Sequence, residues 1–319
     1  MKRYQRASVR DPKRLVDVQP KGTRMSVLVT GSTGYVGLAV ALRLKAAGHE
    51  TFGLTDTVTG TKVLESRGIT PILATLEDGE TIRNITQLVD AVVDVSGHLP
   101  AAKLFLATLE GTEKRYIRNS TSRVYVDASL GSLSRIVHKE GKTVSPIRGL
   151  AEILETDAQV LQAAEMGIHT TVLRPSIPYG EASGPVIGGL IKRAITAGRS
   201  LYVGPGANRQ SHVYLADLAE SFVLAVEKAP SGSLYNIAAG ESSLADISQD
   251  IATILGYPEA LSCTMDAAYE AYGVKFVDGV VAGNCRVDAT KARIELGWLP
   301  KGPGLQDELR EGSYALMWS

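Results

Sequence analysis

The feature that most constrains the fold is a glycine-spaced turn between an apolar run and an amphipathic segment. Residues 26–30 read SVLVT, and residues 31–37 read GSTGYVG. Gly31 permits a tight turn, Gly34 lets the backbone approach a pyrophosphate, and Gly37 allows a helix to pack closely on a strand. The N-terminus of that helix faces the phosphate charge. This stretch therefore predicts a strand–turn–helix unit that binds a dinucleotide.

Beyond Met25, short β-branched runs alternate with longer amphipathic segments. Val36, Val40 and Leu44 lie at i, i+4 and i+8, on one face of a helix that ends near Gly48. The expected strands lie at residues 26–30, 51–54, 70–74, 90–96, 114–120 and 169–175. This alternation predicts an α/β fold with a Rossmann-type, doubly wound parallel sheet that is covered by helices on both faces.

The residue composition and pattern divide the chain into three parts. Residues 1–24 form a basic N-terminal extension, and residues 25–174 form the dinucleotide-binding domain. Residues 175–319 form mostly a substrate-binding lobe, with some segments that return to the sheet. Seven glycines between positions 180 and 206 indicate that this smaller C-terminal lobe is rich in loops.

Charge is distributed unevenly along a chain whose formal net charge is zero. Residues 1–24 carry eight Lys or Arg against two Asp, which gives +6 and leaves −6 for the remainder. An acidic body argues against nucleic-acid binding, because phosphate contacts need clustered basic residues. The basic segment can be an arm attracted to RNA or membranes, a transit peptide, or a solvated extension ahead of a start at Met25. Its two acids, single Ser and lack of an apolar core favour the extension.

Hydropathy and cysteine content suggest the compartment and the partners. No apolar stretch reaches the ~18 residues that a membrane span needs. Cys263 and Cys285 show no metal-binding spacing, so we expect two reduced thiols and a cytoplasmic location. The expected partner is a small-molecule substrate, with no nucleic acid and no membrane. Assembly into a homodimer stays open.

The spacing G-x-x-G-x-x-G, preceded by Thr, resembles that of the short-chain dehydrogenase/reductase superfamily. Four further motifs of its extended or atypical branch, which includes NAD-dependent epimerases and dehydratases, occur in the same order. They are RYIRNSTSRVYVD (115–127), VLRPSIPYG (172–180), HVYLADLAESFVLAVE (212–227) and VDATKARIELGWLP (287–300). The resemblance covers residues 25–312 and implies NAD(P)-dependent oxidoreduction of a small organic substrate. Asp217 precedes an amphipathic run and is expected to cap its helix.

The resemblance also indicates which cofactor is favoured. In this superfamily the residue that ends the second strand contacts the adenosine ribose, and an acid there repels a 2′-phosphate. Thr55 stands at the usual acid position and Asp56 follows it, whereas Thr75 replaces the usual Asp beside the adenine. NAD(H) is therefore favoured, and NADP(H) remains open. The cofactor-binding set that the resemblance implies is Gly31, Ser32, Thr33, Gly34, Tyr35, Val36, Gly37, Asp56, Leu76, Ser96, Gly97 and Pro175.

Catalysis in this superfamily rests on a Ser or Thr hydroxyl together with a Tyr and a Lys spaced Y-x-x-x-K. The Lys lowers the pKa of the Tyr, which exchanges a proton with the substrate oxygen. Counting back four residues from Tyr125 gives Thr121 as the hydroxyl. Tyr125 can also be a packing and substrate-wall residue.

The Tyr and the Lys are not found where the resemblance places them. Aligning Glu155 and Arg174 with the acid and the Arg of the branch puts the Tyr slot at Ile147 and the Lys slot at Ala151. Neither side chain can donate a proton. The resemblance therefore predicts an intact dinucleotide site without the standard acid.

Three explanations of the missing acid remain open at this point. A different residue can supply the proton, with the nearby candidates Tyr125, Tyr179, His98 and Arg148. The hydride acceptor can be electron-poor, as a quinone, an iminium or a conjugated alkene is. Alternatively no net redox reaction occurs, and the protein is a nucleotide-binding regulator or an isomerase or cyclase. Thr121, Tyr125 and His98 are the predicted catalytic residues, although His98 can equally be structural.

Overall fold

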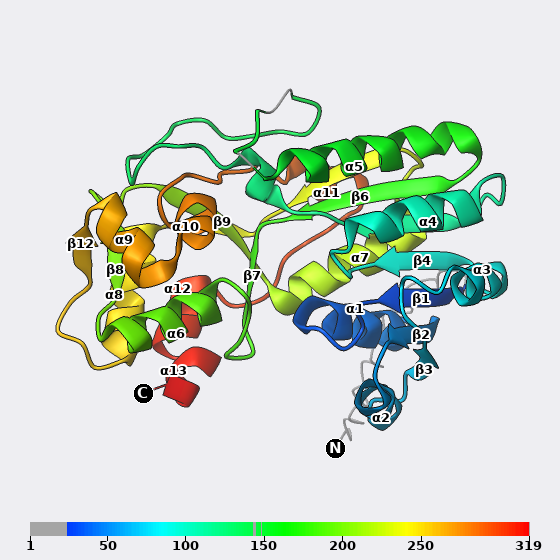
Figure 1. Cartoon of the computed structure of the whole chain (residues 1–319), viewed down its shortest axis with the longest axis horizontal. Coiled ribbons are helices and arrows are strands. Elements are labelled where there is room, and N and C mark those ends of the chain that lie inside the picture. Colours follow the sequence, from blue (N-terminus) through cyan, green and yellow to red (C-terminus); the bar gives the residue numbers. More distant parts are fainter. Residues whose placement is uncertain (1–23, 143–144, 148, 319) are drawn as a thin grey trace, which may run out of the picture.

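A seven-stranded parallel sheet forms the centre of the larger domain (Figure 1). The structure is a computed structural model that describes residues 24–142, 145–147 and 149–318. The strand order is β10-β6-β5-β4-β1-β2-β3. The strands are β1 (Ser26–Thr30), β2 (Glu50–Thr55), β3 (Thr70–Leu73), β4 (Ala91–Asp94), β5 (Arg115–Asn119), β6 (His169–Pro175) and β10 (Ser233–Ile237). The predicted fold class and six predicted strands are confirmed, and the seventh strand comes from the C-terminal half of the chain.

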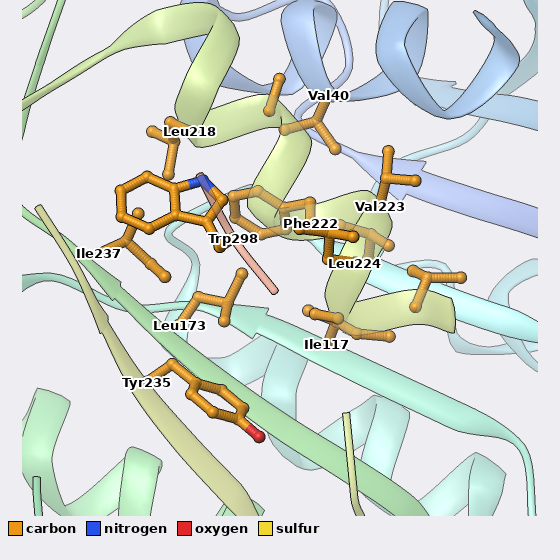
Figure 2. Close-up of a cluster of buried hydrophobic side chains, with 14 of the residues drawn as sticks. Val40, Ile117, Leu173, Leu218, Phe222, Val223, Leu224, Tyr235, Ile237 and Trp298 are labelled. Atoms are coloured by element: carbon orange, nitrogen blue, oxygen red, sulfur yellow. The ribbon is translucent and has the colours of Figure 1, made fainter. Parts of the chain in front are cut away.

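One face of the sheet is covered by helices from both halves of the sequence. These helices are α1 (Tyr35–Ala46), α2 (Val58–Ser66), α7 (Leu215–Lys228) and α11 (Thr290–Glu295). Figure 2 shows Phe222 of α7 and the indole of Trp298 packed above Leu173 of the sheet. All three side chains are fully buried. Burying large apolar side chains of this kind is the main stabilising contribution to a core.

The opposite face carries the helices that connect β3 to β6. They are α3 (Gly79–Leu88), α4 (Leu99–Leu109) and α5 (Ala151–Gln162), and a single 3-10 turn, η2 (Ala163–Met166), follows α5. Phe105 of α4 lies against Tyr116 of β5, with ring centroids 5.8 Å apart. The sheet is therefore sandwiched between two apolar layers, as the alternation of strands and helices predicts.

The C-terminal lobe has a core of its own and is more helical than its glycine content indicates. Its strands are β7 (Ile177–Tyr179), β9 (Arg209–Tyr214) and β11 (Gly240–Ser243) in one small sheet, and β8 (Leu201–Val203) and β12 (Leu261–Cys263) in another. Its helices are α6 (Ile187–Ala197), α8 (Leu244–Ile254), α9 (Met265–Tyr272), α10 (Val274–Phe276), α12 (Leu305–Arg310) and α13 (Ser313–Trp318). One π-helical turn, η3 (Val277–Val281), lies beside α10. The buried side chains of these elements form a separate cluster.

Asp217 joins the lobes instead of capping a helix, so the predicted capping role is wrong. Helix α7 begins at Leu215, which places Asp217 inside the first turn. Its carboxylate accepts hydrogen bonds from the backbone N–H groups of Lys301 and Gly302, both 2.8 Å away. The indole N–H of Trp298 donates to the carbonyl oxygen of the same Asp217. The acid thus fixes the path of the C-terminal segment over α7.

Two absences bear on the expected partners. Among the residues that the structure describes, no helix is both long enough and apolar enough to cross a bilayer. Within those same residues, no group of three or more His, Cys, Asp or Glu is arranged to hold a metal ion. Of the basic extension, residues 1–24, only Arg24 lies within the described residues.

Candidate functional site

The three glycines of the turn serve three different steric purposes. Gly31 has a φ of +60°, and a Cβ added to it would lie 2.9 Å from the carbonyl oxygen of Val95. A Cβ on Gly37 would lie only 2.0 Å from the carbonyl oxygen of Gly31, so the helix and the turn are in direct backbone contact. Gly34 is exposed, and a Cβ there would come near a single atom, at 3.2 Å. Gly34 therefore leaves open space in front of the N-terminus of α1.

A buried carboxylate holds the neighbouring strand ends in place beneath this turn. Asp94, at the end of β4, accepts hydrogen bonds from the hydroxyls of Thr30, Ser96 and Tyr116 at 2.6, 2.7 and 2.9 Å. The backbone N–H of Ser96 also donates to this carboxylate. Hydroxyl and N–H donors of this kind compensate the cost of burying the charge. The turn after β4 is thereby fixed beside the glycine turn.

A cavity of about 280 Å³ opens on one side of Gly31, where β2 and β3 end. Asp56 directly follows β2, and Leu76 lies just beyond β3. The lining residues are Gly31, Thr33, Leu54, Thr55, Asp56, Ala74, Thr75, Leu76, Glu77, Ser96 and His98. This set includes two acids and no Lys or Arg. The cavity therefore disfavours a group that carries additional negative charge.

A second cavity, of about 450 Å³, shares Gly31 with the first and extends to the C-terminal lobe. Its lining residues are Gly31, Gly34, Tyr35, Val36, Gly37, Val95, Asn119, Ser183, Gly184 and Pro185. The side-chain oxygen of Asn119 is buried there without a hydrogen-bond partner. Asn119 and residues 183–185 were missed by sequence reasoning. The position of Asn119, directly before the hydroxyl pair Ser120–Thr121, is the one signal that pointed to it.

Of the remaining predicted cofactor residues, two form hydrogen bonds that join elements of the fold, one is exposed and one is buried. The Ser32 hydroxyl donates to the carbonyl of Leu54 at 2.8 Å, which ties the turn to β2. The Tyr35 hydroxyl donates to the carbonyl of Gly180 at 2.9 Å and joins α1 to the second lobe. Gly97 is exposed, with open space where a Cβ would stand. Pro175 is buried at the end of β6.

Thr121 lies at the carboxyl end of β5, where it begins a 3-10 turn, η1 (Ser122–Tyr125). Its hydroxyl oxygen accepts a hydrogen bond from the backbone N–H of Arg123 at 3.2 Å. A hydroxyl that accepts in this way keeps its own proton free to donate. Thr121 is half-buried and follows Asn119 by two residues, at the same strand end.

Tyr125 is buried against charged groups and not exposed to a cavity. Its hydroxyl accepts a hydrogen bond from a terminal nitrogen of Arg174 at 2.8 Å, and its ring stacks on His138 with centroids 4.9 Å apart. Burial raises the pKa of Tyr125, although the nearby Arg174 opposes that rise. Tyr125 therefore has the surroundings of a packing residue.

Arg174 is itself part of an ion-pair network around one buried carboxylate. The Nε atoms of Arg174 and Arg118 lie 2.9 and 3.0 Å from the carboxylate of Asp157, which is fully buried on α5. The hydroxyl of Ser120 donates to the same carboxylate at 2.7 Å. Glu155, the acid that the alignment above pairs with Arg174, is exposed. The acid that pairs with Arg174 in the structure is therefore Asp157, because the helix turns Asp157 and not Glu155 toward the sheet.

The alignment with Glu155 gives Ile147 and Ala151 as the dyad slots, and the same spacing counted from Asp157 would give Gly149 and Ile153. Neither pair of positions holds a Tyr or a Lys, and no Tyr in the sequence is followed by a Lys four positions later. Arg148, one of the candidate donors, lies outside the described residues.

The other two candidate donors are His98 and Tyr179. His98 lines the first cavity with Asp56, and its Nε2 is 3.8 Å from a carboxylate oxygen of Glu77. The hydroxyl of Tyr179 donates to the carbonyl of Pro303. His98 is thus placed at the end of the groove where β2 and β3 finish, and Tyr179 is committed to a structural contact.

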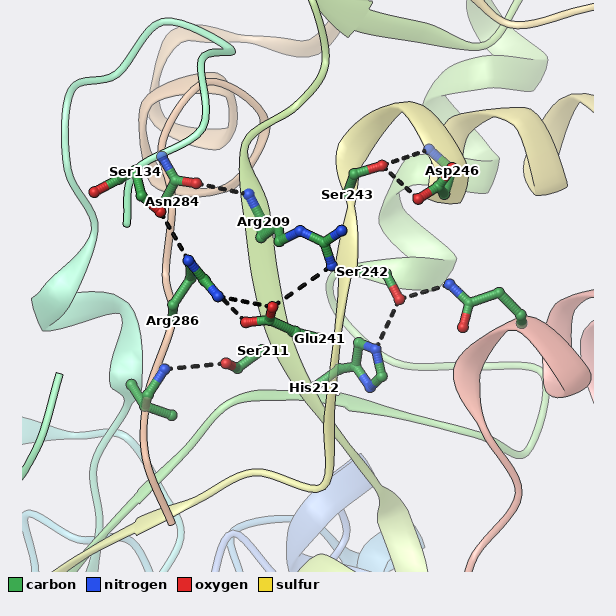
Figure 3. Close-up of polar contacts among 12 residues, drawn as sticks. Ser134, Arg209, Ser211, His212, Glu241, Ser242, Ser243, Asp246, Asn284 and Arg286 are labelled. Carbon is green, nitrogen blue, oxygen red and sulfur yellow. Dashed lines mark hydrogen bonds and ion pairs between the residues drawn. The ribbon is translucent and has the colours of Figure 1, made fainter. Parts of the chain in front are cut away.

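Three basic residues of the C-terminal lobe already form ion pairs, hydrogen bonds or ring contacts within the protein. Figure 3 shows Arg209 and Arg286 converging on Glu241, at 3.5 and 2.9 Å. Arg193 donates to the carbonyl of Tyr272 and lies over the ring of Phe276. These contacts leave Arg209 and Arg193 less able to bind a diphosphate.

A family model matches two long segments of this chain. The model described as "NAD dependent epimerase/dehydratase family" matches residues 27–125 and 151–238, which is more than half of the chain. The matched residues include the glycine turn, η1, α5 and β6.

Individual relatives span nearly the whole chain at low identity. An uncharacterized protein of Schizosaccharomyces pombe is 29% identical over 305 residues, covering 91% of this chain and all of that protein. A 4-hydroxy-2-methyl-3-oxo-4-farnesyl-3,4-dihydroquinoline-1-oxide ketoreductase of Stigmatella aurantiaca is 26% identical, covering 86% of this chain and 80% of that protein. Among solved structures, the dTDP-glucose 4,6-dehydratase of Bacillus anthracis in complex with NAD superposes with a TM-score of 0.73 at 17% identity. It matches 92% of this chain and 96% of that one, and so shows the fold.

Proposed function

Because this chain belongs to the NAD-dependent epimerase/dehydratase family, we propose that it is an NAD(H)-dependent oxidoreductase that acts on a small organic substrate without a Tyr–Lys dyad. The observation that carries this proposal is the pair of cavities that meet at Gly31. A Cβ at Gly34 would enter the space in front of the α1 N-terminus, where backbone N–H groups lack partners within the helix. That space fits a pyrophosphate.

The two cavities suggest how an extended dinucleotide is held. The adenosine half fits the cavity between Asp56 and Leu76, and the nicotinamide half fits the cavity that reaches Asn119. When bound, the nicotinamide supplies or accepts a hydride. Asn119 lines that end, and its buried side-chain oxygen has no hydrogen-bond partner in the protein.

Asp56 sets the expected cofactor preference. With Asp56 and Glu77 in the adenosine cavity and no basic residue there, NADH should bind about tenfold more tightly than NADPH. Asp56→Arg should narrow or invert this ratio, because it replaces a repelling charge with an attracting one. Calorimetric titration of both cofactors into both proteins measures the ratio. A native protein that prefers NADPH would show that Asp56 does not face the ribose.

The proton balance of the reaction determines which substrates are suitable. Hydride transfer to a carbonyl leaves an alkoxide, which needs a proton from a positioned acid. Thr121 can donate a hydrogen bond to the substrate oxygen, but a Thr hydroxyl is a poor acid. Tyr125 is buried against Arg174, and His98 lines the adenosine cavity, so we assign neither as the donor. An acceptor whose product anion is stabilised by conjugation, such as a quinone, needs no strong acid.

A substrate panel tests this proposal. We expect NADH oxidation with quinones, and rates with simple ketones or UDP-sugars lower by about 10²–10⁴, the usual contribution of a positioned acid. Thr121→Val should lower kcat/KM by about tenfold or more, whereas Tyr125→Phe and His98→Ala should have smaller effects. The absorbance of NADH follows every reaction. Rapid turnover of an ordinary ketone by the native protein would refute the dyad-free mechanism.

The same panel separates the proposal from its non-redox alternative. If NADH binds but no acceptor consumes it, the bound nucleotide serves a regulator, an isomerase or a cyclase instead. Mass spectrometry of the molecules that co-purify with the protein then identifies what the site holds.

A further inference from the structure

Arg123 is a charged residue of the candidate site to which the proposed reaction assigns no role. It lies on η1, two residues after Thr121, and its backbone N–H donates to the Thr121 hydroxyl oxygen. Its side chain reaches η3 of the C-terminal lobe. A Cβ added to Gly279 would lie 2.0 Å from a terminal nitrogen of Arg123 and 2.9 Å from its Cζ. The guanidinium therefore lies against η3 of the C-terminal lobe, whereas the backbone of Arg123 contacts the Thr121 hydroxyl.

Within the described part of the chain, no carboxylate neutralises this guanidinium. Arg118 and Arg174 are both paired with Asp157, whereas no described residue forms an ion pair with Arg123. Its Nε is buried and unpartnered. A buried cation without a partner is costly, so such a group calls for a specific explanation.

The neighbouring groups do not supply the missing negative charge. Cys285 is the one group with a Coulombic influence on Arg123, but burial raises the pKa of this thiol to about 11, so it is uncharged near neutral pH. The backbone carbonyl of Ser122 accepts from that thiol. Arg123 is half-buried as a residue, although its Nε is buried.

We propose that Arg123 binds an anionic group of the substrate, a carboxylate or a phosphate-like oxyanion, while Thr121 contacts the reacting oxygen. A guanidinium presents a planar fork of donors that matches such oxyanions in a bidentate way. Because Arg123 and Thr121 lie two residues apart on one turn, the anionic group sits close to the reacting carbon. This assignment of a substrate class rests on the oxidoreductase function proposed above.

Gly279 provides the space in which the guanidinium lies. A methyl group there would meet the flexible end of Arg123 and not backbone atoms, so Gly279→Ala should displace the guanidinium while η1 stays in place. The φ of Gly279 is not positive, so alanine is tolerated at this position. The substitution therefore perturbs the anion site from the opposite lobe.

Direct binding of small anions tests the proposal. Benzoate and inorganic phosphate are titrated by calorimetry into the native protein saturated with NAD⁺, so that phosphate cannot occupy the pyrophosphate position. At least one of the two should bind saturably, and the stronger one identifies the oxyanion. Arg123→Gln should weaken that binding by about tenfold or more, Gly279→Ala should weaken it too, and Arg123→Lys should restore part of it. Arg135→Gln, at an exposed Arg beyond η1, is the matched control and should change nothing.

A kinetic comparison links the anion site to the reaction. The substrates are 1,2-naphthoquinone and its 4-sulfonate, which differ in one anionic group. Arg123→Gln should raise KM for the sulfonate about tenfold more than it raises KM for the neutral quinone, whereas Arg135→Gln should leave the ratio of the two KM values unchanged. If neither quinone is reduced, the oxidoreductase function fails, while the calorimetry still decides the anion site. Absence of saturable anion binding, or equal binding by native protein and Arg123→Gln, overturns the proposal about Arg123.

Discussion

Gly34→Val should abolish the binding of NAD(H) and leave the fold intact. A valine side chain there occupies the space in front of the α1 N-terminus, where we place the pyrophosphate. The backbone of Gly34 is extended, with φ of −82° and ψ of 169°, a conformation that valine adopts easily. Calorimetry should show a loss of affinity of about 100-fold or more, since close backbone approach and several charge-assisted contacts are lost together.

Gly37→Ala is the matched comparison within the same turn. Its methyl group would lie 2.0 Å from the carbonyl oxygen of Gly31, a backbone atom that cannot move aside cheaply. This variant should lose thermal stability, whereas Gly34→Val should melt close to the native temperature. Unchanged NADH affinity in a folded Gly34→Val protein would place the dinucleotide elsewhere.

Asp157→Asn should destabilise the protein strongly. The substitution removes the negative charge between Arg118 and Arg174 and leaves two buried guanidinium groups without a counter-ion. Breaking a buried ion pair from one side typically costs about 3–5 kcal/mol. The free energy of unfolding, measured by urea titration monitored by circular dichroism, should fall by an amount in this range.

Glu155→Gln is the control for that experiment. Glu155 lies on the same helix but is exposed, and no ion pair joins it to Arg174 among the described residues. Its replacement should change the free energy of unfolding by less than about 0.5 kcal/mol. A larger effect at Glu155 than at Asp157 would show that the ion pairs of Asp157 with Arg118 and Arg174 do not stabilise the fold.

Asp157 and Glu155 show which features near the predicted catalytic residues could be predicted from the sequence and which could not. The resemblance aligned Glu155 with the acid of the extended branch, but it did not show which acid of this helix pairs with Arg174. Positions two apart on a helix point about 200° away from each other. Only packing against β5 and β6 decided that Asp157 faces the sheet.

A similar limit applies to residues whose partners are distant in sequence. Asp217 reads locally as a helix cap, yet its partners are the backbone groups of residues 301 and 302. Arg123 reads as an ordinary basic residue of a turn, and its position against Gly279 depends on how the two lobes meet. Asn119 faces a cavity that is completed by residues 183–185 of the second lobe.

The sequence by itself determined the parallel sheet, the glycine turn and the position of Asp56 directly after the second strand. These features depend on short-range properties: the alternation of apolar runs, the steric freedom of glycine and the residues that directly follow a strand. The tertiary structure alone decided which charges are paired, which cavities are continuous and which candidate donors lie near Thr121. Those questions depend on helix phase and on contacts between segments far apart in the chain, because burial and charge pairing are set by neighbours in space and not by neighbours in sequence.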